Sequence, residues 1–442
     1  MRLPTLAVAC IAAAAAAAAA THAANPFATR EQRAIDANTT SLYRDTALDS
    51  ARRDAHAQYL HTLKKYQVAI TAQVQEDVRE AIDELAFMCV QRAVNNDPAS
   101  PKLSWGDTAP RPRAAHTPAV PGSRYSYDNP DCFYGIVPIS SKYTYRLRGR
   151  RTGDGPADVS FSLISNPASQ NTVAALYGRD LRVEDDGSYT VTISSAPRGD
   201  ANHIQSSGNV VQLFIRNDLG DWKSERPDEL SVERVGDPPV HKERASAAVL
   251  QDAVTNLKEA TFFYGFGALD FKTFSVATNT LSSPSQSLSL GTLTSQASSF
   301  GHFDLRDNEA LVVTMRPGHS TYWVVPVYTV GMITVNPGAR QVSLNNRQSA
   351  ANGDGSYTFV VSKEDPLVHN WLDTAGRAQG TMMVRWQGLP SSGDGARGIS
   401  IDAKVVKLAA LRGALPAGTK YLSKRERDHQ LKQRKTYYDR LH

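Results

Sequence analysis

Cysteine is scarce in this chain of 442 residues, which contains only three. Cys10 falls in an N-terminal apolar run, which leaves Cys89 and Cys132 for the folded protein. A disulfide between them would close a loop of about 43 residues and stabilise the fold by roughly 4 kcal/mol in the chain-entropy picture. Two separate buried thiols explain the same residues equally well, so both interpretations stay open.

Local motifs for metal binding and catalysis are absent. The histidines of the chain beyond residue 125 and before the tail show no His-x-His, His-x-x-x-His or His-Glu-x-x-His spacing, so we assign no metal and no cofactor. Gly-x-Ser-x-Gly is also missing, which excludes the usual nucleophile elbow of hydrolases. Gly265-Phe266-Gly267 lacks the third glycine of a phosphate-binding loop and predicts a close-packing turn.

Long apolar runs are absent after the first residues. Arg2 precedes the alanine-rich run Leu6 to Ala20, and small residues follow it. This pattern is typical of a secretory signal peptide over residues 1–23, cleaved after Ala23. We therefore expect a bacterial protein that is periplasmic or secreted.

Excess charge is confined to the end of the chain. The formal net charge is +5, and residues 420–442 hold eight Lys or Arg against Glu426, Asp428 and Asp439. The rest is close to neutral, which argues against a nucleic-acid-binding body. The segment Lys424–Arg440 is either a solvated helix with internal charge pairs or a contact for an anionic envelope surface, such as phospholipid or a phosphorylated glycan.

The segment 24–96 lacks glycine, and proline is absent from it between Arg30 and Asn96, so it predicts helix. An apolar stripe needs a partner surface, which is a second helix, the β body or another subunit through oligomerisation. A proline-rich linker over 97–124 follows, and Trp105 is expected to fix it to the body. The stripe consists of Tyr59, Leu63, Tyr66, Ile70, Val74, Val78, Ile82, Leu85 and Cys89.

From Tyr125 the apolar residues alternate with polar ones, and turn signals separate the runs. The pattern predicts a mainly β fold of two tandem, related, antiparallel β-sandwich units with a jelly-roll-like character. We expect the first unit over 125–240, a bridging helix over 241–262, the second unit over 263–411 and a basic tail over 412–442.

A repeated phrase indicates the duplication. Asp-Gly-Ser-Tyr-Thr starts at Asp186 and again at Asp354, an offset of 168 residues. Flanking matches follow in the same order: Tyr134-Gly135 with Phe300-Gly301, Asn202 with Asn370, and Arg216 with Arg385. The phrase itself is most simply a turn that enters a strand, so it is not a site.

Several segments also resemble a known family. They are Asp128-Asn129-Pro130-Asp131, Tyr145–Gly149, Asp221-Trp222, Ser299–Phe303, Ser343–Asn346, Val368–Thr374 and Gly380–Gln387. Over roughly residues 125–390 the chain resembles the bacterial family called domain of unknown function twelve-fourteen, which often occurs with its partner family, twelve-fifty-four. The resemblance implies a β-sandwich fold and no established activity.

Positions where the two copies differ are candidates for a specialised site, whereas shared positions are expected to serve the fold. His302, Asp373 and Gln387 differ from their counterparts. A histidine beside an aspartate acts as a general base with its orienting partner, and an arginine holds an anion. The catalytic candidates are His302, His369, Asp373 and Arg385, and the ligand-binding candidates are Asn345, Asn346, Trp386 and Gln387. The same residues are compatible with separate surface and loop positions.

In the first copy, Asp218, Asp221 and Arg226 surround Trp222, which favours a loop salt bridge over acid chemistry with paired carboxylates. Two functions fit the whole pattern. One is an exported protein that binds an unknown small molecule or envelope glycan or lipid. The alternative is an exported hydrolase or lyase that acts on a glycan, lipid or small envelope molecule through the site in the second unit.

Overall fold

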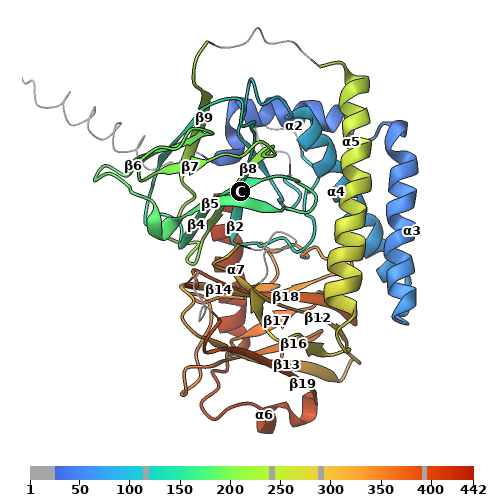
Figure 1. The fold of residues 1–442 in the computed structure, drawn as a ribbon. Helices are drawn as coiled ribbons and strands as arrows, with labels where there is room; N and C mark the ends of the chain where they lie inside the picture. Colours follow the sequence, from blue (N-terminus) through green and yellow to red (C-terminus); the bar gives the residue numbers. More distant parts are fainter. Residues whose placement is uncertain (1–24, 113–118, 238–243, 287–292, 391–395) are drawn as a thin grey trace, which may run out of the picture.

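The computed structural model describes residues 25–112, 119–237, 244–286, 293–390 and 396–442. The expected signal peptide over 1–23 lies outside these ranges. Two β units lie one above the other, and the long helices α3, α4 and α5 run along one side of both (Figure 1). The predicted fold class, mainly β with two related sandwich units, is confirmed.

The N-terminal segment is helical but not continuous. Short 3-10 turns and two breaks divide it, and the second break places Gln67 at φ 58°. At Thr71 the chain starts a new helix, because its side chain accepts a hydrogen bond from the Val74 N–H. The prediction of one uninterrupted run without Pro or Gly was thus too simple. The elements are η1 (Pro26–Ala28), α2 (Arg30–Leu42), η2 (Thr46–Leu48), α3 (Asp49–Lys65) and α4 (Ala72–Val94).

The apolar stripe survives the break and is buried within the chain. Tyr59 and Leu63 of α3 share one core with Val78 and Cys89 of α4. The same core includes Met332 of the second β unit. The helical layer thereby joins the second unit to the rest of the molecule.

The first β unit is a sandwich of a five-stranded sheet, ordered β1-β2-β8-β4-β5, and a four-stranded sheet, ordered β7-β6-β3-β9. Linker residue Trp105 lies in β1, where it packs against Phe133, so it does fix the linker to the body. The strands are β1 (Ser104–Gly106), β2 (Cys132–Pro138), β3 (Tyr145–Arg150), β4 (Asp158–Ile164), β5 (Thr172–Tyr177), β6 (Ser188–Ser194), β7 (His203–Gln205), β8 (Gln212–Asp218) and β9 (Glu229–Arg234), with η3 (Gly178–Asp180) after β5.

The bridging helix is longer than expected. It begins as α5 (Ser246–Ala260) and continues without interruption as the π-helix η4 (Thr261–Phe274). Gly265 therefore lies in a helix and not in the predicted turn, although its close packing is real: a Cβ there would meet Gln58 Cγ at 3.1 Å. The second β unit begins after this helix and not at residue 263.

The second unit repeats the first. Its larger sheet is ordered β10-β12-β18-β14-β15, with β11 paired to β12, and its smaller sheet is ordered β17-β16-β13-β19. Only the β6–β7 and β16–β17 pairs of the described strands are parallel. The strands are β10 (Thr280–Leu281), β11 (Ser285–Gln286), β12 (Ala297–Asp304), β13 (Glu309–Pro317), β14 (Tyr322–Tyr328), β15 (Ser343–Asn345), β16 (Tyr357–Ser362), β17 (Trp371–Asp373), β18 (Gln379–Gln387) and β19 (Ile399–Lys407).

Matching contacts show which shared residues serve the fold. The Asn202 side chain accepts from the Arg182 N–H and donates to the Arg182 carbonyl, and Asn370 does the same with Ala350. The repeated phrase forms a turn before β6 and β16, with its glycines at φ 82° and 77°. One expected match, Gly135 with Gly301, is displaced by two residues. Gly135 pairs with Ile215, so its counterpart should pair with Val384, whereas Gly301 pairs with Met382.

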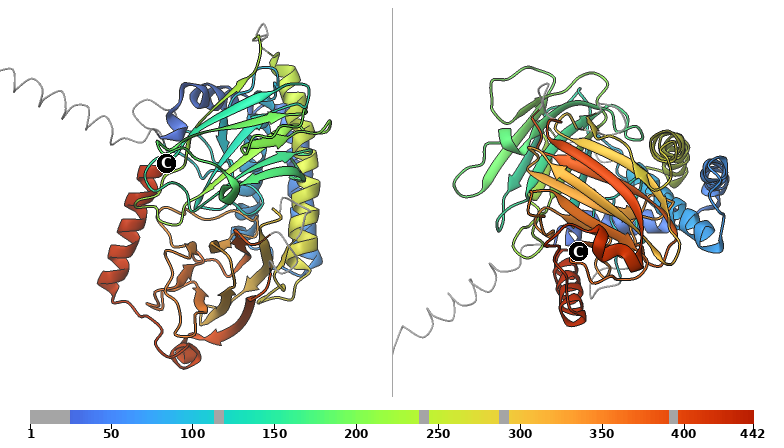
Figure 2. Two further views of the ribbon diagram at one scale, coloured as in Figure 1. Left: turned by 60° about the vertical axis from the view of Figure 1, so that its left-hand side comes forward. Right: turned by 90° about the horizontal axis from the view of Figure 1, so that it is seen from below.

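The basic tail packs against both units. After η5 (Leu408–Ala410) and α6 (Leu411–Ala414), helix α7 (Lys424–Leu441) runs from the second unit to the first, on the side away from α5 in the left view of Figure 2. Arg427 and Arg434 are buried, so α7 is not the fully solvated helix of one prediction. In the described part of the chain, no helix has the length and apolar character needed to cross a membrane.

Candidate functional site

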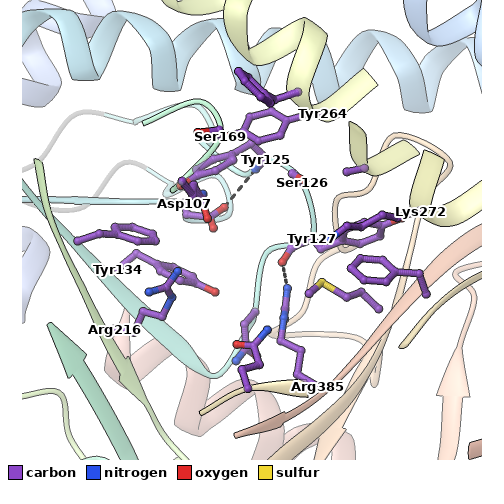
Figure 3. A pocket seen from close by; sticks show the side chains of 18 of the residues that line it. Asp107, Tyr125, Ser126, Tyr127, Tyr134, Ser169, Arg216, Tyr264, Lys272 and Arg385 are labelled. Atoms are coloured by element: carbon purple, nitrogen blue, oxygen red, sulfur yellow. Dashed lines mark hydrogen bonds between the residues drawn. The ribbon is translucent and has the colours of Figure 1, made fainter. Parts of the chain in front are cut away.

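A cavity lies where the two β units meet, with about 70 Å³ of space for water-sized groups. Figure 3 shows side chains converging on it from both units, from the linker and from η4. A space of this size holds several waters or one small molecule. The lining residues are Asp107, Tyr125, Ser126, Tyr127, Asn129, Tyr134, Ser169, Gln170, Phe214, Arg216, Asp218, Phe263, Tyr264, Ala268, Lys272, Gln296, Phe300, Met383, Arg385 and Gln387.

The duplication supplies the central part of this lining. Successive side chains of a strand point to opposite faces of the sheet. In β8, Leu213 and Ile215 therefore enter the sandwich core, whereas Phe214, Arg216 and Asp218 face outward. In β18 the equivalent outward side chains are Met383, Arg385 and Gln387. The same three positions of two related strands thus face one cavity.

Arg385 is the cation contributed by the second unit. Its side chain is buried, and one guanidinium nitrogen donates to the Tyr127 carbonyl, as Figure 3 shows. An arginine keeps its charge at any ordinary pH, so burial leaves a cation at this wall. Its Nη1 has no hydrogen-bond partner among the described residues.

Arg216 is its counterpart from the first unit. The guanidinium lies 4.4 Å from the centre of the Phe214 ring, and Nη1 donates to Ser162 Oγ at 3.4 Å. Lys272 of η4 adds a third cationic group, and burial lowers the pKa of its ammonium group. Three basic side chains from three elements therefore surround the cavity.

Two carboxyl groups, Asp107 and Asp218, share the same lining. Burial raises the pKa of Asp107 well above its ordinary range, and burial also raises the pKa of Asp218. Asp218 accepts hydrogen bonds from Asn129 Nδ2 at 2.9 Å and from Gln387 Nε2 at 3.1 Å. A raised pKa means that each carboxyl group binds a proton more readily than a free one does. The arginines keep their positive charge, so the lining favours an anion.

The segment between the linker and β2 lines the cavity in a fixed conformation. Ser126 and Tyr127 have φ values of 34° and 74°, a left-handed region that is unfavourable for residues with a Cβ. The Tyr127 N–H donates to the Met332 carbonyl, and the Tyr125 N–H donates to Asp107 Oδ1 at 3.1 Å. Residues held in such conformations cluster at binding and catalytic sites.

Three buried polar atoms at this cavity have no hydrogen-bond partner within the described part of the chain. Among the described residues, Arg385 Nη1, Gln387 Oε1 and the Tyr264 hydroxyl have no hydrogen-bond partner, and all three side chains line the cavity. A buried polar atom without a partner costs about 1–3 kcal/mol. A bound water or ligand removes that cost.

The structure does not bring the predicted catalytic residues together. His302 of β12 contacts the Thr278 hydroxyl at 3.1 Å and the Thr273 carbonyl at 3.3 Å. Asp373 lies in β17 of the other sheet, where it forms an ion pair with Arg340 at 2.8 Å. In the described part of the chain no hydrogen bond links either histidine to Asp373.

His369 and the predicted ligand-binding residues also have separate partners. His369 Nδ1 lies 3.1 Å from Asn370 Oδ1, and Asn346 donates to the Thr321 carbonyl. Asn345 donates to Asp131, and Trp386 belongs to the core of the second sandwich. Of the eight predicted site residues, Arg385 and Gln387 line the cavity.

The loop around Trp222 is held by hydrogen bonds. Trp222 Nε1 donates to Asp131 Oδ1 at 2.9 Å, and Asp221 accepts from the Lys223 N–H. Arg226 donates to main-chain carbonyls, so the expected salt bridge with Asp221 is not formed between these residues. Asp218 lies apart from this loop, at the cavity.

The disulfide interpretation is wrong. Cys89 lies in α4 and Cys132 in β2, and both are buried free thiols in different clusters. Burial raises the pKa of Cys89 to about 12 and raises that of Cys132 well above its ordinary range, so both stay protonated. In the described ranges, no three His, Cys, Asp or Glu side chains gather as a metal site would require.

Comparison with known protein families finds one match. Residues 301–389 match the family described as "Protein of unknown function (DUF1214)". The matched residues lie in the second β unit. The expected resemblance is thereby confirmed over this segment, which contributes Met383, Arg385 and Gln387 of β18 to the cavity. No curated protein matches the chain.

Solved structures show the fold alone. One from Burkholderia cenocepacia, of an uncharacterised protein, shares 22% identity over 84% of this chain and 99% of that chain, with a TM-score of 0.69. The VPA0106 protein of Vibrio parahaemolyticus shares 12% identity over 62% of this chain and 89% of that chain, with a TM-score of 0.40.

Proposed function

We propose that this is an exported protein that binds a small anion in the cavity between its two β units. One observation carries the proposal: Arg216 and Arg385, at the same position of two duplicated strands, line one cavity. Two buried guanidinium groups near each other repel, and an anion between them offsets that repulsion. The signal-like residues 1–23 support export to the periplasm or beyond.

The surroundings favour an organic anion over a hydrated inorganic ion. Aromatic side chains from the first unit and η4 border the charged centre, among them Tyr125, Tyr134 and Tyr264. Binding sites for small molecules combine such apolar walls with a few polar groups that fix orientation. The basic tail stays a separate candidate for contact with an anionic surface, because Lys424, Arg425 and Lys432 are exposed.

Isothermal titration calorimetry tests the proposal. The exported protein is titrated with acetate, lactate and sulfate, with neutral propane-1,2-diol and with ethylammonium. We expect heat of binding from anions only, and a loss of at least about tenfold in affinity for Arg385→Met.

The matched control is Arg427→Met, because Arg427 is an equally buried arginine that contacts Asp365 and the Val368 carbonyl, away from the cavity. It should bind as the wild type does. Anion binding that survives Arg385→Met, or no binding of any anion, contradicts the proposal.

A further inference from the structure

The geometry points to a specific class of ligand for this cavity, a small hydroxycarboxylate of the size of glycolate or lactate. This inference rests on the proposed function and deepens it. It follows from the size of the cavity, from the hydrogen-bonding groups that β18 leaves without partners, and from the difference between the two duplicated positions.

Size limits the ligand first. The cavity offers about 70 Å³, whereas a cavity of about 150 Å³ is what accommodates benzene. A carboxylate with one or two further carbon atoms fits this space, and a fused ring system does not. The aromatic walls suit a short apolar portion such as a methyl group.

The two groups without partners require complementary chemistry. Arg385 Nη1 is a donor and needs an acceptor, whereas Gln387 Oε1 is an acceptor and needs a donor. Residues two apart in a strand lie on the same face, so both requirements meet in one ligand. A carboxylate satisfies the arginine, and a neighbouring hydroxyl group donates to the glutamine.

The orientation of Gln387 is fixed by the first unit. Its Nε2 donates to Asp218 Oδ2 at 3.1 Å, so the amide oxygen cannot exchange places with the nitrogen without losing that bond. Both partnerless atoms are covered by neighbouring side chains. A ligand therefore reaches them through a small rotation of each side-chain end.

The two copies differ at the position of Gln387, and this difference predicts how the ligand is oriented in the cavity. Beside Arg216 the duplicated strand has Asp218, whose carboxyl oxygens already accept hydrogen bonds from Asn129 and Gln387, and beside Arg385 it has Gln387, whose Oε1 has no partner among the described residues. The carboxylate group of the ligand is thus expected at Arg385. Its hydroxyl group lies toward Gln387.

The test compares three ligands that differ by one group. Lactate has both groups, propionate lacks the hydroxyl and propane-1,2-diol lacks the carboxylate. By calorimetry with the full exported chain, lactate should bind roughly five- to tenfold more tightly than propionate, and the diol should not bind.

Gln387→Met should bring the two affinities within about twofold of each other while propionate still binds. The matched control is Gln379→Met, because Gln379 lies in the same strand and also donates to an aspartate, Asp304, at 3.1 Å, outside the cavity. It should keep the preference for lactate.

The possible outcomes distinguish a failure of the hydroxycarboxylate inference from a failure of the proposed anion binding. Equal affinities of lactate and propionate for the wild type, or a preference that survives Gln387→Met, overturn the hydroxycarboxylate inference. If sulfate or another anion binds in an Arg385-dependent manner and no carboxylate does, the inference fails and the proposed function stands. Absence of any Arg385-dependent anion binding overturns both.

Discussion

Arg124 connects three parts of the molecule, and its replacement by methionine gives a sharp test of the interpretation. Its side chain is 3% exposed and forms an ion pair with Glu84 of α4, itself 5% exposed. Its Nε donates to Glu84 Oε2 at 2.8 Å, and its Nη1 donates to the Thr334 carbonyl of the second unit. The backbone N–H of Arg124 donates to the same carboxylate at 2.9 Å.

The expected loss of stability follows from the charge left behind. Removal of one partner of a buried ion pair typically costs about 3–5 kcal/mol, because the other charge stays buried without compensation. Burial already raises the pKa of Glu84, and the attraction of Arg124 opposes that rise. Without Arg124 the folded-state pKa of Glu84 rises further above its unfolded value.

The sign of the pH dependence is therefore fixed. A carboxyl whose folded pKa lies above its unfolded pKa favours the folded state at low pH, and this stability is lost as pH rises through the folded pKa. Arg124→Met should cost more at pH 8 than at pH 5. In the double variant Arg124→Met, Glu84→Gln the extra pH dependence should disappear and part of the stability should return.

Urea unfolding followed by circular dichroism at both pH values measures these effects. Arg79→Met is the control, because the Arg79 pair with Glu76 is more than half exposed and contributes about 0–1 kcal/mol. A loss below about 1 kcal/mol for Arg124→Met, or an equal loss at pH 5 and pH 8, would refute the assignment of a buried, charge-compensating role.

Three further predictions concern other sites. Ellman's reagent should find no reactive thiol in native protein that lacks residues 1–23, and two thiols after unfolding without reductant, because Cys89 and Cys132 are buried and free. No reactive thiol after unfolding would instead indicate a disulfide. Asp158→Asn should stabilise the protein at pH 8, by at most about 4 kcal/mol, and not at pH 4, because burial, with Asp218 nearby, raises the pKa of Asp158 to about 7 and its charged form is unfavourable in the fold. A flat difference across pH speaks against that. Reversal of Lys424, Arg425 and Lys432 to Glu should abolish salt-sensitive cosedimentation with anionic vesicles, and unchanged cosedimentation removes the tail from any surface contact.

The sandwich architecture could be predicted because its signals are local. Alternation of apolar residues and glycine turns act within a few residues, and the repeated phrase indicates the duplication directly. The breaks in the N-terminal helices could not be predicted. They depend on tertiary packing of α3 and α4 into one core, which outweighs the absence of proline and glycine.

The candidate site was harder to predict, and one assumption explains why. Shared residues were expected to serve the fold, which agrees with the contacts of Asn370, whereas Arg385, a shared residue that was also a candidate for holding an anion, lines the cavity. The useful signal was already in the sequence: each copy places an arginine inside an apolar strand, at Arg216 and Arg385. Such a charge is unfavourable in a sheet buried on both faces unless something compensates it.

The duplication itself gives the reason why both arginines persist. In one isolated unit, the outward face of β8 or β18 would meet solvent, and the arginine would be an ordinary surface residue. Stacking of two units buries both faces, since every residue of β8 and of β18 is buried in the whole molecule. In the proposed function the two guanidinium groups hold an anion, whereas the difference between Asp218 and Gln387 distinguishes one side of the cavity from the other. A shared cation with a differing neighbour is thus the pattern expected when two copies of one unit face the same asymmetric ligand.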